Sequence, residues 1–158
     1  MLFRSATHGH FDHIMAAGEI QLSTNTPFYI NKKDQFLLDR VEETVEYFLG
    51  SKKIVLPIKN IKNLNIENSL KIENFKLKII YTSGHSPGGC SYYFPQEKIV
   101  FTGDTLFKRT IGRCDFSYCS KKDLDTSLKK LFKLPGETIV YPGHGEKTTI
   151  QEELFFHS

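Results

Sequence analysis

Apolar and polar residues follow two different rhythms along this chain, and the change between them separates a helical stretch from a β-rich one. Between residues 34 and 48 apolar side chains recur every three to four positions, which predicts an amphipathic helix that ends at Gly50. From residue 53 to residue 82 the pattern becomes that of short strands bounded by turn residues. The strand candidates in this stretch are 54–58, 69–72 and 75–81.

The remaining elements alternate between strands and helices. Short strands are expected at 2–6, 27–30 and 138–141, and a hairpin at 92–94 and 99–101. A helix is expected at 14–21, and another should start at Ser120, which has Asp123 three residues later as in a capping box. A last helix should begin near Thr149. This alternation predicts an α/β layered fold, and the absence of repeats and linkers predicts one domain over residues 1–158.

Composition narrows the function classes. The 158 residues are 39% hydrophobic and 25% charged, which is typical of a globular chain, and no apolar run is long enough to cross a bilayer. The net charge is +3, but the lysines lie in separate pairs and form no basic stripe, so we expect no nucleic-acid partner. No secretory signal is readable, and the three cysteines form no CxxC motif, so the expected location is the cytoplasm.

The histidines are concentrated in short motifs. Three of the six lie with an aspartate in the segment 8–13, as His8, His10, Asp12 and His13. His85 and His144 each lie in a turn rich in glycine and proline, and Asp104 follows a predicted strand in Thr-Gly-Asp-Thr. Only His157 lies outside a motif. Because strand ends and glycine turns can direct side chains to a shared point, these residues are candidates for one site.

Imidazole and carboxylate groups are ligands for zinc, iron and manganese. The two histidines of His8-Gly9-His10 project to the same side if the segment is extended, since side chains repeat every second residue. Seven candidate ligands suit two divalent ions that share one carboxylate, and such a pair can hold a bridging hydroxide as a nucleophile. We expect zinc as the metal, with iron and manganese as alternatives. Asp12 and Asp104 are expected to serve catalysis as well as metal binding.

Four motifs together resemble the metallo-β-lactamase superfamily. They are Thr-His-Gly-His-Phe-Asp-His at 7–13, Gly-His-Ser-Pro-Gly at 84–88, Thr-Gly-Asp-Thr-Leu-Phe at 102–107 and Pro-Gly-His-Gly at 142–145. Within the superfamily the chain is most similar to glyoxalase II-like hydroxyacylglutathione hydrolases of the short bacterial type, which the stretches 111–116 and 145–150 also match. The resemblance covers nearly the whole chain and implies a metallo-β-lactamase-like αββα sandwich.

The resemblance also implies roles for individual residues. The first metal would be held by His8, His10, His85 and Asp104. The second would be held by Asp12, His13, Asp104 and His144, with Asp104 shared. The implied reaction is hydrolysis of a small anionic thioester, such as S-2-hydroxyacylglutathione, by the metal-bridging hydroxide. Arg113 lies where related enzymes place a basic residue that touches the substrate, and a loop-bracing role for it is an equal alternative.

The resemblance departs at both ends of the chain. Family members begin with a β-rich segment before the first metal motif, where this chain has only residues 1–6, so we expect a sheet that lacks strands and exposes apolar surface. A truncated reading frame would explain this, as would another cover for the edge. Long glyoxalase II enzymes also carry a C-terminal helical domain that binds glutathione, whereas this chain ends with residues 151–158, which leaves a broader thioesterase open.

Two other functions remain as hypotheses. One is a persulfide dioxygenase of the same superfamily, which would use a single iron held by His8, His85 and Asp104. The other is an inactive remnant, or half of a protein that needs a partner chain. The complete set of second-site ligands favours the dinuclear hydrolase over both.

Overall fold

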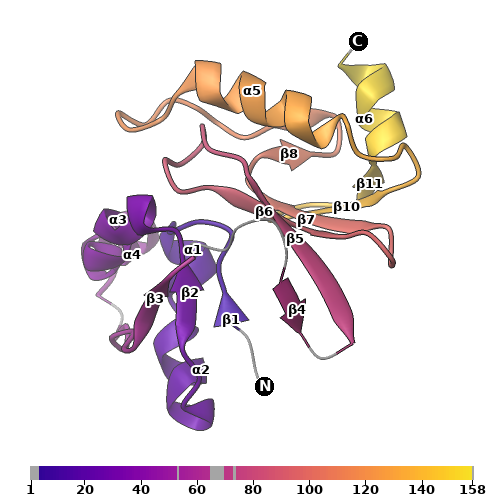
Figure 1. Ribbon diagram of the computed structural model, residues 1–158. Coiled ribbons are helices and arrows are strands. Elements are labelled where there is room, and N and C mark those ends of the chain that lie inside the picture. Colours follow the sequence, from indigo (N-terminus) through magenta and orange to yellow (C-terminus); the bar gives the residue numbers. More distant parts are fainter. Residues whose placement is uncertain (1–3, 53, 65–69, 73, 158) are drawn as a thin grey trace.

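Two β-sheets packed between helices form the fold. The computed structural model describes residues 4–52, 54–64, 70–72 and 74–157. Figure 1 shows helices α5 (Lys121–Leu131) and α6 (Ile150–Phe156) over one face of the larger sheet. The smaller sheet and the N-terminal helices lie on its other side. The arrangement is the predicted αββα sandwich, with the elements up to residue 63 on one side and those from residue 70 onward on the other.

The smaller sheet is parallel and has the order β1-β2-β3. Its strands are β1 (Arg4–Ser5), β2 (Phe28–Ile30) and β3 (Ile61–Asn63). The helical elements of this half are α1 (Phe11–Ile14), α2 (Ala17–Thr24), the 3-10 turn η1 (Lys32–Asp34), α3 (Gln35–Asp39) and α4 (Val41–Leu49). Buried apolar side chains from these elements, among them Ile14, Ile30 and Leu38, form its core.

The larger sheet has the order β11-β10-β7-β6-β5-β4. Its strands are β4 (Leu70–Ile72), β5 (Phe75–Tyr81), β6 (Cys90–Phe94), β7 (Ile99–Gly103), β10 (Ile139–Pro142) and β11 (Thr148–Thr149). A separate hairpin joins β8 (Leu106–Phe107) and β9 (Thr110–Ile111). The predicted hairpin at 92–101 is confirmed, with Phe94 opposite Ile99.

The two C-terminal helices begin where the sequence predicts, and each start has a side-chain cap. Ser120 accepts a hydrogen bond from the backbone of Asp123, and Thr149 forms a full capping box with Glu152. In α5 the residues Leu124, Leu128 and Leu131 face the sheet and are buried against Val100 and Val140. Burial of this apolar stripe fixes α5 across the strands and therefore fixes the crossover between β7 and β10.

Strand direction gathers the predicted motifs at one edge of the larger sheet. Strand β10 runs parallel to β7. Strands β5 and β7 are both antiparallel to β6, so β5 runs in the same direction as β7 and β10. The carboxyl ends of all three strands therefore lie at the same edge. His85, Asp104 and His144 follow these ends, and the segment after β1 is tied to the start of β6 by a hydrogen bond from Cys90 N to Thr7 O of 2.9 Å.

Three of the predicted elements need correction. The helix over 34–48 is broken at Arg40 into α3 and α4, a bend that an apolar spacing pattern does not encode. The helix at 14–21 is instead two helices, 11–14 and 17–24, joined at Met15 and Ala16. The strand at 54–58 is wrong: residues 54–59 form no strand, Pro57 has no N–H to donate to a ladder, and the strand of this region is β3.

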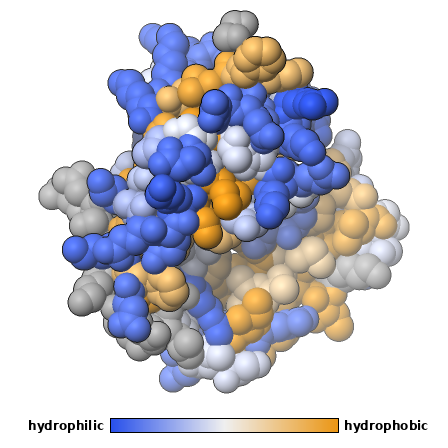
Figure 2. Space-filling view, turned by 90° about the vertical axis from the view of Figure 1, so that its right-hand side faces the viewer, coloured by the Kyte–Doolittle hydropathy of each residue, from blue (hydrophilic) through white to orange (hydrophobic). Residues whose placement is uncertain are grey.

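Aromatic side chains form a ladder across the face of the larger sheet that is turned away from α5. Phe75, Phe94, Phe101 and Tyr141 contact one another in that order, with ring centroids 6.1, 5.9 and 5.5 Å apart. Phe75 and Phe101 remain 48% and 42% exposed beside a groove that Tyr92 and Leu77 also line. Figure 2 shows apolar side chains around a hollow on the side of the β6–β7 hairpin. These rings leave apolar surface exposed on this face of the sheet. No helix among the described residues is long and apolar enough to cross a membrane.

Candidate metal centre

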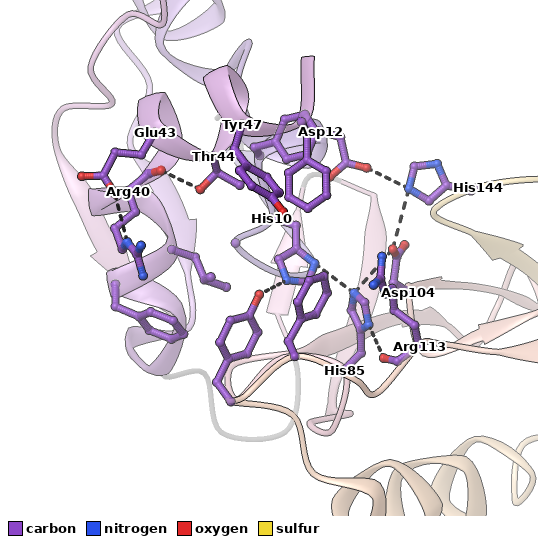
Figure 3. A pocket seen from close by; sticks show the side chains of 17 residues that line it. His10, Asp12, Arg40, Glu43, Thr44, Tyr47, His85, Asp104, Arg113 and His144 are labelled. Atoms are coloured by element: carbon purple, nitrogen blue, oxygen red, sulfur yellow. Dashed lines mark hydrogen bonds and ion pairs between the residues drawn. The ribbon is translucent and has the colours of Figure 1, made fainter. Parts of the chain in front are cut away.

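Five of the seven candidate ligands project from loops that follow strands, and the other two from the short helix α1. His8 and His10 follow β1, Asp12 and His13 lie in α1, and His85, Asp104 and His144 follow β5, β7 and β10. Figure 3 shows His10, His85, Asp104 and His144 directed toward a common space between the two halves of the fold. The structure therefore brings together every residue that the sequence proposes as a ligand.

Three imidazoles form the inner group. Ring nitrogens of His8, His10 and His85 all lie within 4.8 Å of one another, and Nδ1 of His10 faces Nε2 of His85 at 2.9 Å. His8 and His85 are 2% and 5% exposed, so this group lies inside the protein. Three imidazoles converging through different ring nitrogens are an arrangement that a transition-metal ion can occupy.

The outer group combines two imidazoles with a carboxylate. Nε2 of His144 lies 3.0 Å from Oδ2 of Asp12 and 3.2 Å from Nε2 of His13. Their side chains are more exposed than the inner group, 55% for His144 and 36% for Asp12. His144 and Asp12 therefore meet the solvent, whereas His8 and His85 are buried.

Asp104 lies between the two groups. Its Oδ1 is 3.3 Å from Nε2 of His13, and its Oδ2 is 3.6 Å from His85, 3.7 Å from His144 and 4.0 Å from His8. One carboxylate surrounded by four imidazoles is the geometry expected of a ligand shared by two ions. Gly103, in the left-handed region at φ 53°, turns the chain here, and Gly143 packs so close to Asp104 that a Cβ would collide with its carboxylate.

Burial and charge keep His8, His10 and Asp104 in the forms that bind a cation, whereas for His13 burial is outweighed by the contact with Asp104, which raises its pKa. Burial, followed by the charges of the other histidines, holds the pKa of His8 well below its usual range and lowers the pKa of His10 to about 4. Burial alone would raise the pKa of Asp104, but its contacts with His13 and the charges of His85 and His144 outweigh it and leave the pKa lowered. His8 and His10 are therefore neutral and Asp104 ionised at neutral pH, which are the forms that ligate metals.

Two buried polar atoms in the described part of the chain support this interpretation directly. Nε2 of His8 and Oδ1 of Asp104 are inaccessible to solvent and form no well-oriented hydrogen bond, although Nε2 of His13 lies 3.3 Å from that oxygen. An unsatisfied buried polar atom costs about 1–3 kcal/mol, so native proteins rarely keep one without a reason. A metal ion between these atoms would satisfy both. The donor set and its orphaned atoms thus fit divalent metal ions.

Asp34 joins the two loops that carry the inner histidines. This carboxylate is fully buried and accepts hydrogen bonds from the backbone of Gly9 at 2.9 Å, the backbone of Gly88 at 2.5 Å and the hydroxyl of Ser86 at 2.7 Å. Gly9 separates His8 from His10, and Ser86 follows His85. The sequence did not point to Asp34 because this residue lies far beyond His13 along the chain, at the start of a predicted helix.

Two of the inner histidines also form hydrogen bonds through the ring nitrogen that points away from the site. Nδ1 of His85 donates to the backbone oxygen of Arg113 at 2.8 Å, which leaves Nε2 to face the site. Nε2 of His10 lies 2.9 Å from the hydroxyl of Tyr118. With Nδ1 of His10 as a ligand atom, Nε2 carries the hydrogen and Tyr118 accepts it. Such contacts fix the tautomer and orientation of metal-binding histidines. Tyr118 is the second residue that the sequence did not single out.

Comparison with known proteins identifies the family. The sequence profile of the metallo-beta-lactamase superfamily matches residues 6–144 of this chain. The chain belongs to this superfamily. It is 35% identical over 151 residues to a protein of Haemophilus influenzae named hydroxyacylglutathione hydrolase GloC, covering 93% of this chain and 70% of that protein. Other similar proteins carry the more general name of probable metallo-hydrolase, among them one from Bacillus subtilis at 34% identity.

Solved structures of the superfamily have the same fold. TTHA1623, described in a di-iron-bound form, has a TM-score of 0.85 and 32% identity, and covers 97% of this chain and 74% of that one. The B3 metallo-beta-lactamase BLEG-1 also has a TM-score of 0.85, at 35% identity, with 98% of this chain and 74% of that one covered. Membership of the superfamily, together with the convergent histidines and aspartates, implies divalent metals at this site.

Arg113 lies at the rim of this superfamily site. Its guanidinium pairs with both oxygens of Asp115, at 2.7 and 2.6 Å, and lies 4.4 Å above the centre of the Phe116 ring. Arg113 lines the same cavity as His10, Asp104 and His144. Its backbone oxygen also accepts the hydrogen bond from Nδ1 of His85, a contact that does not depend on the arginine side chain. Substrate contact by its side chain stays a prediction.

Replacing Tyr118 by phenylalanine is expected to weaken metal binding about tenfold without unfolding the protein. Loss of an outer hydrogen bond to a ligating histidine typically costs this much or more, because the imidazole loses its fixed tautomer. Competition with a chromophoric chelator would measure the affinity. Tyr81→Phe is the matched control, since it removes a hydroxyl that bonds to the Leu64 backbone, away from the site. Equal affinities in the Tyr118 and Tyr81 variants would contradict the assignment.

Proposed function

We propose that this chain is a metal-dependent hydrolase that cleaves small thioesters of the S-2-hydroxyacylglutathione kind. The observation that carries the proposal is Asp104, a carboxylate only 12% exposed with four imidazole nitrogens within 4.0 Å. It supports a dinuclear centre, because it lies between two ligand groups that each have enough donors for an ion of their own. The name of the Haemophilus influenzae relative supports the thioester substrate.

Each part of the site has a role in this proposal. The inner ion would be held by His8, His10 and His85, and the outer ion by Asp12, His13 and His144. Asp104 would bind both ions. Bound divalent ions would supply Lewis acidity and make water nucleophilic at neutral pH. The exposed Asp12 lies within 3.5 Å of His13 and 3.0 Å of His144, so it orients the outer imidazoles on the side open to solvent. Arg113 at the rim would orient an anionic end of the substrate.

The proposal is tested by assaying S-lactoylglutathione and other thioesters with protein of measured metal content. Hydrolysis is expected with two divalent ions per chain, and the metal analysis would also show whether they are zinc, iron or manganese. A protein that carries two ions and hydrolyses none of the thioesters would overturn the proposal.

The same measurements separate the dioxygenase hypothesis. That reaction would need one iron per chain and would consume oxygen with glutathione persulfide as substrate. The close approach of Asp12, His13 and His144 favours a second ion and therefore the hydrolase. One iron per chain with oxygen uptake would favour the dioxygenase.

Removing the metal should destabilise the protein measurably. An ion present at a hundred times its dissociation constant stabilises the native state by about 2.7 kcal/mol, provided that it does not bind the unfolded chain. For a domain of this size that corresponds to a fall in Tm of roughly 5–10 °C on chelation. Differential scanning fluorimetry before and after chelation, and after metal is restored, would measure it. An unchanged Tm after complete metal removal would contradict a site that spans both halves of the fold.

A further inference from the structure

A large cavity opens directly beside the metal centre. Its volume is about 840 Å³, and it is bounded on one side by His10, His85, Asp104 and His144. Figure 3 shows Tyr47, Thr44, Glu43 and Arg40 of the α3–α4 region on the far side of this space from His144. A cavity of this size holds a ligand much larger than a lactoyl group.

Aromatic rings form two walls of the cavity. One wall comes from α1 and α4, where the ring of Phe48 stacks on Phe11 at 5.4 Å between centroids and contacts Tyr47 at 5.1 Å. Phe48 and Tyr47 are 48% and 80% exposed. Apolar rings left accessible around a cavity mark a binding surface rather than a core.

The opposite wall comes from the loop after β9. Phe116 and Tyr118 stack at 5.3 Å, and Phe116 lies 5.3 Å from the ring of the candidate ligand His10. Phe36 of α3 packs edge-on against Tyr118 at 5.3 Å and extends this wall. The rings thus continue to the position where the scissile bond would lie.

The positive charges at the rim are already paired. Arg40 lies 3.2 Å from the carboxylate of Glu43, and Arg113 is held by both oxygens of Asp115. A glutathione moiety carries two carboxylates, and it would have to compete with these acidic partners for each guanidinium. The two paired arginines therefore attract a highly anionic substrate less strongly than two unpaired arginines would.

From these walls and charges we infer that the cavity selects thioesters in which a group next to the scissile bond is apolar and at least ring-sized. The inference rests on the proposed function and narrows its substrate class. The rings of Phe48 and Phe116 would face this group on either side, and the metal ligands would lie at the carbonyl. The small polar lactoyl group would leave most of the aromatic surface in contact with water.

Two matched pairs of substrates test the inference with the metal-loaded full chain. S-mandeloylglutathione differs from S-lactoylglutathione by a phenyl ring in place of a methyl on the acyl side. The acetyl thioester of 2-phenylethanethiol differs from that of ethanethiol by a phenyl ring on the thiol side. In at least one pair we expect kcat/KM to rise about tenfold or more with the phenyl group, mainly through KM. Ratios below threefold in both pairs would overturn the inference.

Binding of thioethers separates this inference from the proposed function. S-benzylglutathione and S-methylglutathione contain no thioester bond, so calorimetry reports on the cavity alone. We expect the benzyl compound to bind about tenfold more tightly. Tighter benzyl binding without hydrolysis of any thioester would overturn the proposed function and leave the apolar cavity standing. Hydrolysis of both pairs without a preference for the phenyl substrate would overturn this inference and leave the proposed function standing.

Variants on α4 locate the effect. The quantity to compare is the ratio of kcat/KM between the phenyl substrate and its smaller counterpart, in the pair that shows the preference. Phe48→Ala is expected to lower this ratio about tenfold, and Tyr47→Ser, at a more exposed position, is expected to lower it less. Leu49→Ala is the matched control: this side chain is 46% exposed on the same helix but does not line the cavity. Thermal unfolding and metal content would show that each variant is folded and loaded. A ratio that Phe48→Ala leaves unchanged, or that Leu49→Ala lowers equally, would overturn the assignment to this wall.

Discussion

Asparagine in place of Asp104 is expected to remove metal from both halves of the site and to lower hydrolytic activity roughly a thousandfold or more. The substitution keeps the size of the side chain but removes the negative charge that four imidazoles surround. A neutral amide offers one oxygen where the carboxylate offers two, so it cannot serve both groups of ligands. The metal content of the purified variant and its thioester hydrolysis would be measured together.

Asp125→Asn supplies the control for this change. Asp125 lies on α5, where it pairs with Lys121 at 3.4 Å on the surface. Its replacement should leave both metal content and activity at the level of the unaltered protein. If the Asp104 variant retained two ions and more than a tenth of the activity, Asp104 would not be a shared ligand.

Replacing Asp34 by alanine should destabilise the protein by about 3–5 kcal/mol, because the backbone of Gly9, the backbone of Gly88 and the hydroxyl of Ser86 lose their common acceptor inside the protein. The Tm should fall by roughly 6–20 °C. Metal affinity should fall as well, since the loops of His8, His10 and His85 are no longer held together.

Chemical denaturation with and without metal would separate the two effects. Asp39→Ala is the matched control, because Asp39 lies nearby on α3 but is exposed, with only Gln35 as its hydrogen-bond partner among the described contacts. A loss of stability with unchanged metal affinity would show that Asp34 stabilises the fold but does not position the metal ligands. Equal stability of the Asp34 and Asp39 variants would contradict its bracing role altogether.

The set of candidate ligands could be read from the sequence because local chemistry marks each one. Histidine and aspartate in short glycine-rich turns after strands are unusual enough to be recognised without knowing the fold. The family resemblance implies their division into two sets, and the structure shows how the fold brings each set together: the inner histidines come from the loops after β1 and β5, and the outer residues from α1 and the loop after β10. Asp34 and Tyr118 carry no such local mark. A single aspartate at a helix start and a tyrosine in a loop acquire their roles only through contacts with distant segments.

The elements were predictable where one local signal dominated. Ser120 and Thr149 begin their helices as their capping patterns indicate, and Gly50 ends α4 in the left-handed conformation at φ 65°. The short parallel strand β3 and the break at Arg40 depend on the packing of neighbouring elements. Their sequences favour no single structure, so an apolar pattern alone could not place them.

The two halves of the metal centre differ in their access to solvent, and this difference should affect how fast each bound ion exchanges with the solvent. His8 and His85 lie beneath the surface, whereas His144 and Asp12 form its outer rim. The cavity also reaches His10 and His85, so an ion held by the inner residues would exchange through the cavity, whereas an ion held by the outer residues would meet the solvent directly. The outer ion is therefore expected to leave first on chelation, and the inner ion to be the last one removed.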